Sequence, residues 1–224
     1  MGRKNMRKIF ADTFMALVEE SGRKRVSVVD LTTRVGCERK TFYRYFDDID
    51  DLIIWIYRDA LRDVVLTKFP DDTPVKPHPS LGDKYADWPF YVRIFDDKGG
   101  LAQGPYFEAS AGHFESHSAY YANIFQIQND KVEYRSLLEY MRKLFIPAIR
   151  EDALILAHGK IIPQDHIDFL ADYHTTAIME RLYQFICRKN ERMSAEDVLH
   201  WNYAHTAMER DLNRYFAQPA VKRR

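Results

Sequence analysis

Apolar side chains recur every three or four positions from the start of the chain. The first stripe consists of Met6, Phe10, Phe14, Leu17 and Val18. This spacing predicts a helix that buries one face. Gly22 follows the stripe, and glycine often ends a helix because it adopts the left-handed backbone conformation at little steric cost.

A capping pattern marks the start of a second, short helix. Ser27 is followed three positions later by Asp30, and this spacing is typical of a capping box, in which the two residues satisfy each other's backbone N–H groups. Gly36 arrives nine residues after Ser27, so the sequence predicts that this helix ends there in a tight turn.

Two further helices follow this turn. The segment 38–46 predicts a short helix with Phe42 and Phe46 on its buried side, and Asp48 then caps a longer helix that continues to about Phe69. A supporting helix, a short helix, a glycine turn and a second short helix have the order and spacing of a helix-turn-helix.

The exposed face of the second short helix carries cations and long polar side chains. Its members are Arg39, Lys40, Thr41, Tyr43, Arg44 and Tyr45. Side chains of these types donate hydrogen bonds to phosphate oxygens and to base edges in the major groove. The sequence therefore predicts that this face contacts double-stranded DNA.

The remaining chain predicts a larger helical body. Four prolines between residues 70 and 80 interrupt any helix there, and eleven aromatic residues follow between 83 and 125. The helical segments expected in the body are 113–127, 132–157, 164–189 and 195–216. The stretch from Phe90 to Phe95 fits either a strand or a helix. We thus expect an all-α protein with an N-terminal three-helix DNA-binding domain (1–50) and a larger helical domain (51–224), whose expected roles in ligand binding and dimerisation come from the family resemblance described below.

Charge separates the same two regions. The chain as a whole has a formal net charge of zero, but residues 1–46 carry 11 Lys or Arg against 5 acidic residues, a net charge of +6. The rest of the chain therefore carries −6. A basic head on an acidic body is expected where one end of a protein meets a polyanion.

Composition points to a globular cytoplasmic protein. Apolar residues make up 46% of the chain and charged residues 29%, and there are only two cysteines, which fits a reducing compartment. The longest continuous apolar run, Leu52 to Tyr57, is too short to cross a bilayer. We therefore expect no membrane partner.

One cluster leaves an enzymatic function open. His113 and His117 lie four positions apart with Glu115 between them, a spacing at which metal ligands occur on helices. No phosphate-binding glycine loop, nucleophile elbow or Cys-x-x-Cys motif is found in the sequence. The sequence favours a protein without a cofactor and without catalysis, and a metal-dependent helical enzyme is the alternative.

The stretch SVVDLTTRVGCERKTFYRYFDDIDDLIIWIY resembles the TetR family of bacterial transcriptional regulators, and the likeness covers roughly residues 5–65. The resemblance implies a homodimer that places two recognition helices in successive major grooves of a palindromic operator, and a body that holds a small-molecule effector pocket. By position, the residues implied to face bases are Arg39, Lys40 and Tyr43. Those implied to face the DNA backbone are Ser27, Thr41, Arg44 and Tyr45.

The body is also similar to a TetR subgroup related to dihydroxyacetone-kinase regulators, through the stretch HTTAIMERLYQFICRKNERMSAEDVLHW. In the head, Tyr45 stands where the family usually has histidine. Ile49 stands where the family commonly has a phosphate-contacting lysine, among Asp47, Asp48, Asp50 and Asp51. These carboxylates predict a weaker and more salt-sensitive DNA complex. They also motivate another hypothesis, in which the protein binds a protein partner as a coregulator and no longer binds DNA.

Overall fold

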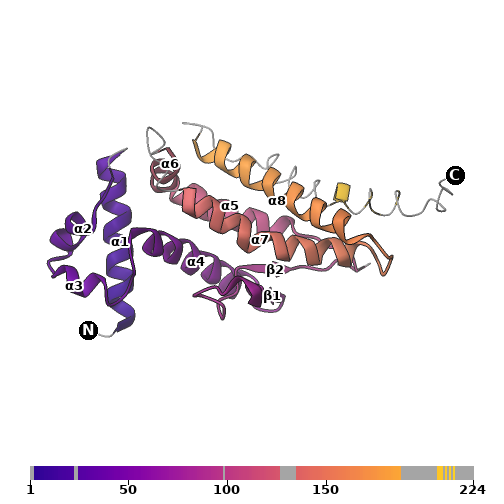
Figure 1. Cartoon of the computed structure of the whole chain (residues 1–224), viewed down its shortest axis with the longest axis horizontal. Helices are drawn as coiled ribbons and strands as arrows, with labels where there is room; N and C mark the ends of the chain where they lie inside the picture. The colour runs from indigo at the N-terminus through magenta and orange to yellow at the C-terminus, as the bar shows by residue number, and fades with distance from the viewer. Residues whose placement is uncertain are drawn as a thin grey trace.

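The computed structural model describes residues 3–22, 25–97, 99–126, 135–187, 206–208, 210, 212 and 214. It is mainly helical, as expected (Figure 1). The elements of the head are α1 (Arg3–Ser21), α2 (Val28–Val35) and α3 (Arg39–Phe42). The elements that follow are α4 (Ile49–Lys68), β1 (Thr73–Val75), a 3-10 turn η1 (Pro79–Leu81), β2 (Tyr91–Arg93), α5 (Gly104–Ser116), α6 (Ser118–Gln126), α7 (Arg135–Leu156) and α8 (Gln164–Cys187).

The head is held together by an aromatic cluster under α3. Phe10 and Phe42 are both fully buried, and their rings meet edge to face with centroids 5.5 Å apart. Phe46 is 1% exposed and joins the same cluster. The apolar stripe predicted for the first helix therefore supports the short helix that carries the cationic face, and the inward orientation of Phe42 and Phe46 is confirmed.

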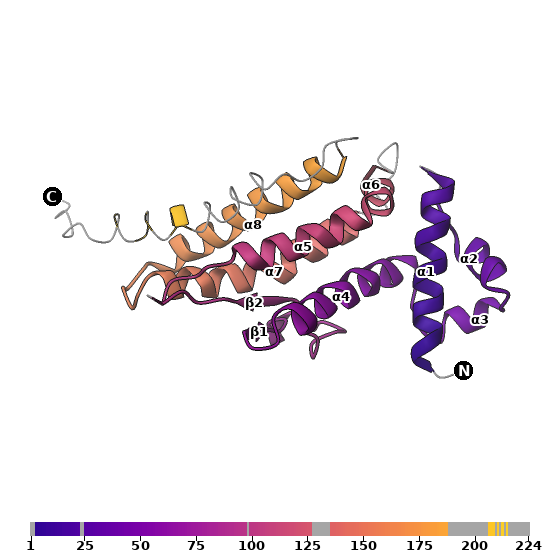
Figure 2. The ribbon, with the colours of Figure 1, turned by 180° about the vertical axis from the view of Figure 1, so that it is seen from behind.

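Helix α4 leads from the head into an elongated body built mainly from α5, α7 and α8 (Figures 1 and 2). Buried side chains form one continuous apolar core from Phe10 in the head to Ile186 at the end of α8. Since Ile49, Leu52 and Ile53 of α4 belong to this core, the first turns of α4 are packed against other apolar groups and are not a free linker.

The body contains a small sheet besides its helices. Strands β1 and β2 pair antiparallel, with Val75 opposite Tyr91. The segment from Phe90 to Phe95, which fits either element by its pattern, thus forms a strand over Tyr91–Arg93. Pro74 lies in β1, where it is tolerated because a two-stranded sheet consists of edges only.

The segment predicted as one helix over 113–127 is helical within its described part, but it is divided between two helices, and the first of them starts earlier than predicted. Helix α5 begins at Gly104 and ends at Ser116, and α6 starts at Ser118. The Ser116 hydroxyl donates to the carbonyl of His113 (2.9 Å), and His117 Nδ1 lies 3.1 Å from the same oxygen. Side chains thus take the acceptor that a continuing helix would use for the amide of His117, and the helix breaks there.

The two long helices expected next are confirmed as α7 and α8, and Pro147 lies inside α7. Most of the helix predicted over 195–216 lies outside the described residues. Within it, Met208 and Leu212 are buried, and they pack with Ala153, Leu156 and Ile167. No helix in the described ranges combines the length and the apolar character needed to span a membrane.

Candidate nucleic-acid interface

The start of α2 is fixed by the predicted capping box. Ser27 Oγ accepts from the amide of Asp30 (3.2 Å), while the Asp30 carboxylate accepts from the amide of Ser27 (2.8 Å). The Ser27 hydroxyl also donates to Asp30 Oδ2 (2.7 Å), and these bonds to Ser27 lower the pKa of Asp30. The Ser27 hydroxyl therefore already forms hydrogen bonds within the capping box.

Gly36 makes the tight turn that separates α2 from α3. Its φ of 74° lies in the left-handed region, and its amide donates to the carbonyls of Thr32 and Thr33. A side chain at this position would be strained, because L-residues rarely adopt this conformation. The turn thereby sets the angle at which α3 leaves α2.

Helix α3 is shorter than the segment 38–46 that the sequence predicts. Regular helix covers Arg39–Phe42, and the chain then continues as a turn in which the amide of Phe46 donates to the carbonyl of Phe42 (3.1 Å). The turn keeps Phe46 on the buried side although the helix has ended. Its hydrogen bonds therefore preserve the two-sided character of the segment.

The predicted DNA-facing residues differ in how far they reach into solvent. Arg39, Lys40, Tyr43 and Arg44 are exposed, and the side chain of Tyr43 is half accessible. Thr41 and Tyr45 are partly buried, and the Tyr45 ring lies 6.1 Å from that of Phe10. Lys40 pairs with Glu38, its Nζ 2.7 Å from the carboxylate. The structure thus brings four long donors together on one exposed surface.

Arg34, another cation of the head, is paired with an acidic side chain of α1. Arg34 on α2 makes a two-pronged bond to Glu20 on α1, with N–O distances of 3.2 and 2.6 Å. This bond raises the pKa of Arg34 and lowers that of Glu20. Arg34 and Arg39 lie only five positions apart along the chain. The main difference between them is that Arg34 is paired with Glu20.

The acidic residues around the start of α4 are held by groups that sequence reasoning missed. Asp48 caps α4 by accepting from the amide of Asp51 (2.8 Å). Lys84, from the loop before β2, bridges Asp47 (3.0 Å) and Asp51 (2.6 Å), and Tyr85 donates to the other oxygen of Asp51 (2.9 Å). The bonds to these carboxylates outweigh burial and raise the pKa of Lys84. Lys84 thus neutralises part of the acidic cluster, across a separation of more than 30 residues that no local pattern signals.

Ile49 belongs to the core and is only 6% exposed. A lysine at this position would place an ammonium group among apolar side chains, at a cost of several kcal/mol. The substitution Ile49→Lys would therefore destabilise the fold by burying a charge, and its effect on DNA binding would not report phosphate contact alone.

The histidine pair lies where the head meets the body. A cleft of about 420 Å³ is lined by Lys8 of α1, Asp59 and Asp63 of α4, and His113 and His117 of α5 and its end. The two imidazole rings are 4.8 Å apart, and His113 Nε2 lies 3.0 Å from the Tyr121 hydroxyl. In the parts of the chain that the structure describes, no group of three or more His, Cys, Asp or Glu side chains could hold a metal ion.

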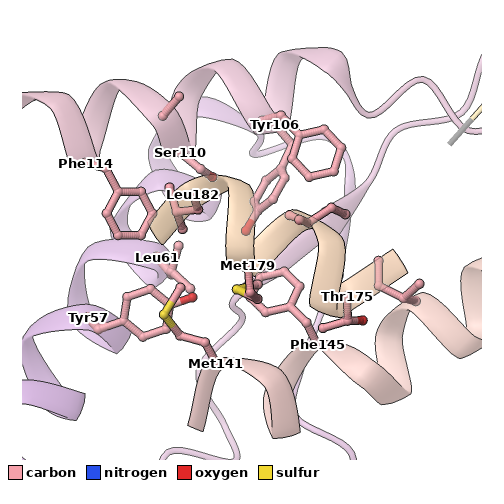
Figure 3. A pocket seen from close by; sticks show the side chains of 14 residues that line it. Tyr57, Leu61, Tyr106, Ser110, Phe114, Met141, Phe145, Thr175, Met179 and Leu182 are labelled. Carbon is pink, nitrogen blue, oxygen red and sulfur yellow. The ribbon is translucent and has the colours of Figure 1, made fainter. Parts of the chain in front are cut away.

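A second cavity lies inside the body, between α4, α5, α7 and α8 (Figure 3). Its volume is about 40 Å³, and its walls are almost entirely apolar and aromatic. Sequence reasoning expected a pocket among the aromatic residues of the body but did not identify its walls. Its members Tyr57, Tyr106 and Thr175 come from segments up to 118 residues apart, so only the packing of the helices brings them together.

Comparison with known proteins relates this arrangement to transcriptional regulators. No family model matches the chain, and no curated protein sequence matches it. Among solved structures, the chain is similar to the dihydroxyacetone kinase operon activator DhaS, with a TM-score of 0.52, 14% identity and 94% of this chain and 96% of that chain covered. It is also similar to a protein from Pseudomonas aeruginosa PAO1 assigned as a transcriptional regulator, with a TM-score of 0.56, 14% identity and 96% of both chains covered.

The chain therefore has the all-helical fold of transcriptional regulators. The predicted resemblance to TetR-like regulators is confirmed at the level of the fold. DhaS, one of the similar structures, is by its name a dihydroxyacetone kinase operon activator, and at 14% identity the similarity concerns the fold alone.

Proposed function

We propose that this protein is a TetR-like transcriptional regulator that acts in the cytoplasm, binds palindromic operator DNA as a homodimer, and changes its DNA affinity when a small effector or a partner binds to the body. Residues 1–50 are the DNA-binding domain in this proposal, and residues 51–224 bind the effector and dimerise. The fold of the regulators described above supports the proposal at its coarsest level.

One observation carries the DNA-binding part of the proposal. Arg39, Lys40, Tyr43 and Arg44 are exposed together on α3 and the turn that follows it, and the other side of this segment is anchored by fully buried Phe42. A rigid support with projecting donors is what a recognition helix requires in a major groove. A helix of a plain bundle gains nothing from this concentration of exposed cations.

Two arginines of the head provide a matched test. The variants Arg39→Ala and Arg34→Ala remove the same charge, but Arg34 is bound to Glu20 and Arg39 belongs to the projecting surface. DNA that flanks the gene of this protein serves as the probe, in a fluorescence anisotropy titration at several salt concentrations. Thermal unfolding of each variant checks that it is folded.

The proposal predicts different results for the two variants. Arg39→Ala should lower operator affinity by a factor of about 5 to 150, the loss expected for one base contact, and should reduce discrimination against unrelated DNA. Arg34→Ala should alter affinity by less than about threefold. Equal losses in both variants would mean that only net charge matters, and no binding by the folded wild-type protein at low salt would refute DNA binding.

The coregulator hypothesis has a specific observation in its favour. The side chain of Asp47 is 83% exposed beside the predicted DNA surface, although it pairs with Lys84. A folded wild-type protein that fails to bind DNA, and that recovers binding when Asp47 is replaced by Asn, would favour this second function.

A further inference from the structure

Among the residues that the structure describes, no charged side chain lines the cavity inside the body. Its fourteen lining side chains are aromatic, aliphatic or hydroxyl-bearing (Figure 3). Five of these side chains are aromatic, namely Tyr57, Tyr106, Phe107, Phe114 and Phe145. Aromatic walls favour a ring as occupant, because rings pack edge to face or with an offset. A carboxylate or ammonium group would lose its hydration here without gaining a counter-charge.

Hydroxyl groups interrupt the apolar wall on three sides. Thr175 on α8 is fully buried and Ser110 on α5 is 7% exposed, and neither Thr175 Oγ1 nor Ser110 Oγ has a hydrogen-bond partner of good geometry in the described structure. Tyr57 on α4 is 1% exposed, and its hydroxyl end points into the group of lining side chains (Figure 3). Burial keeps the pKa of Tyr57 far above its ordinary value, so its hydroxyl stays neutral and can donate.

Tyr106 shows how a hydroxyl in this cavity is satisfied when its role is structural. Its OH donates to the carbonyl of Phe90 at 2.8 Å. Buried polar groups in native proteins are nearly always paired in this way. The Thr175 hydroxyl has no such partner in the described structure and contributes nothing comparable to the fold, so it can bind an occupant. The Ser110 hydroxyl lies near the Tyr106 hydroxyl without a hydrogen bond of good geometry.

The size of the cavity limits the occupant. A volume of about 40 Å³ exceeds the roughly 10–15 Å³ that one water molecule needs. It is also smaller than the roughly 150 Å³ of a cavity that holds benzene, so a single ring enters only if lining side chains move. Met141 and Met179 also line the cavity, and methionine side chains adapt to an incoming group because they have three rotatable bonds and no branch.

We propose that this cavity binds a small uncharged molecule that has an aromatic body and one hydroxyl or carbonyl group, and that Ser110 or Thr175 forms the polar contact. This ligand class deepens the proposed effector site and rests on the proposed function only for its effect on DNA binding. Tyr57 and Leu61 belong to α4, whose first residue, Ile49, lies in the core shared with the head. A ligand that displaces α4 would therefore move the head.

The test uses phenol as the probe and benzoate as its charged counterpart. The thermal midpoint of the full-length protein is followed by circular dichroism at pH 7.5 while each compound is added to 10 mM. A ligand that binds only the folded state raises the midpoint as its concentration rises. We expect phenol to raise the midpoint and benzoate to leave it unchanged.

Two variants that each remove one hydroxyl locate the polar contact, and a third is the control. Thr175→Val and Ser110→Ala remove the unpaired hydroxyls, whereas Thr176→Val changes the neighbouring exposed position. At least one of the first two should weaken phenol binding about two- to tenfold, the worth of one hydrogen bond. Thr176→Val should not. Thr175→Val should also raise the midpoint of the free protein, because a methyl group replaces a buried hydroxyl that has no partner.

The outcomes separate this inference from the proposed function. Failure of phenol to raise the midpoint, equal binding of benzoate, or unchanged phenol binding in both cavity variants would overturn it. Operator binding by the ligand-free protein is measured separately by anisotropy. Operator binding without phenol binding would refute the ligand class alone, and phenol binding without operator binding would refute the regulator.

Discussion

Acidification should destabilise this protein through one histidine at the boundary between head and body. His113 is partly buried near the end of α5, against the ring of His117 and beside a cleft that Lys8 of α1 also lines. Burial, and then the proximity of His117 and Lys8, lower the pKa of His113 from 6.5 to about 4. The folded protein therefore binds this proton less readily than the unfolded chain does.

The sign of the effect follows from this difference. Well above pH 6.5 the histidine is neutral in both states, so its contribution to stability is complete. As the pH falls from 6.5 toward 4, the unfolded chain takes up a proton that the folded protein refuses, and the free energy of unfolding decreases. From the two pKa values, the loss at pH 5 is about 2 kcal/mol relative to neutral pH.

Urea unfolding at pH 7.5 and pH 5 measures this loss. The variant His113→Gln cannot take up the proton, so its free energy of unfolding should fall by about 2 kcal/mol less than that of the wild type between the two pH values. His166→Gln, at an exposed position on α8, is the control and should behave like the wild type. An equal pH dependence in the wild type and His113→Gln would refute the assignment of this titration to His113.

Two other changes test the packing and the charges of the head. Phe42→Ala removes a ring from the aromatic cluster beneath the cationic face and should lower the free energy of unfolding, measured in urea, by about 3–5 kcal/mol. The control Val29→Ala, at an exposed site, should change it by less than about 0.5 kcal/mol. A loss below about 1 kcal/mol for Phe42→Ala would contradict the buried role of this ring. Lys84→Met frees two carboxylates beside the predicted DNA surface, so DNA should bind about two- to fivefold more weakly at low salt, with a smaller effect at high salt. Lys68→Met, at the far end of α4, should leave the affinity unchanged, and an equal loss in both lysine variants would show that Lys84 has no special effect.

Local signals in the sequence were sufficient for much of the head and for the long helices. The capping box of Ser27 and Asp30, the turn at Gly36 and the inward face of Phe42 all depend on residues within a few positions of one another. Hydrogen bonds of caps and the 3.6-residue helical period act over this same short range. The sequence therefore determined the helical fold, the exposed cationic face and the approximate bounds of α7 and α8.

Tertiary structure decided the features that join distant segments. The pairing of β1 with β2 needs two strands that the sequence pattern left undefined. Lys84 reaches Asp51 from a loop 33 residues away. The Thr175 hydroxyl and the Tyr57 ring line one cavity only because α4 and α8 both pack against α7. Such contacts depend on how helices pack in space, and hydrophobic periodicity specifies which face of a helix is buried but not which neighbour covers it.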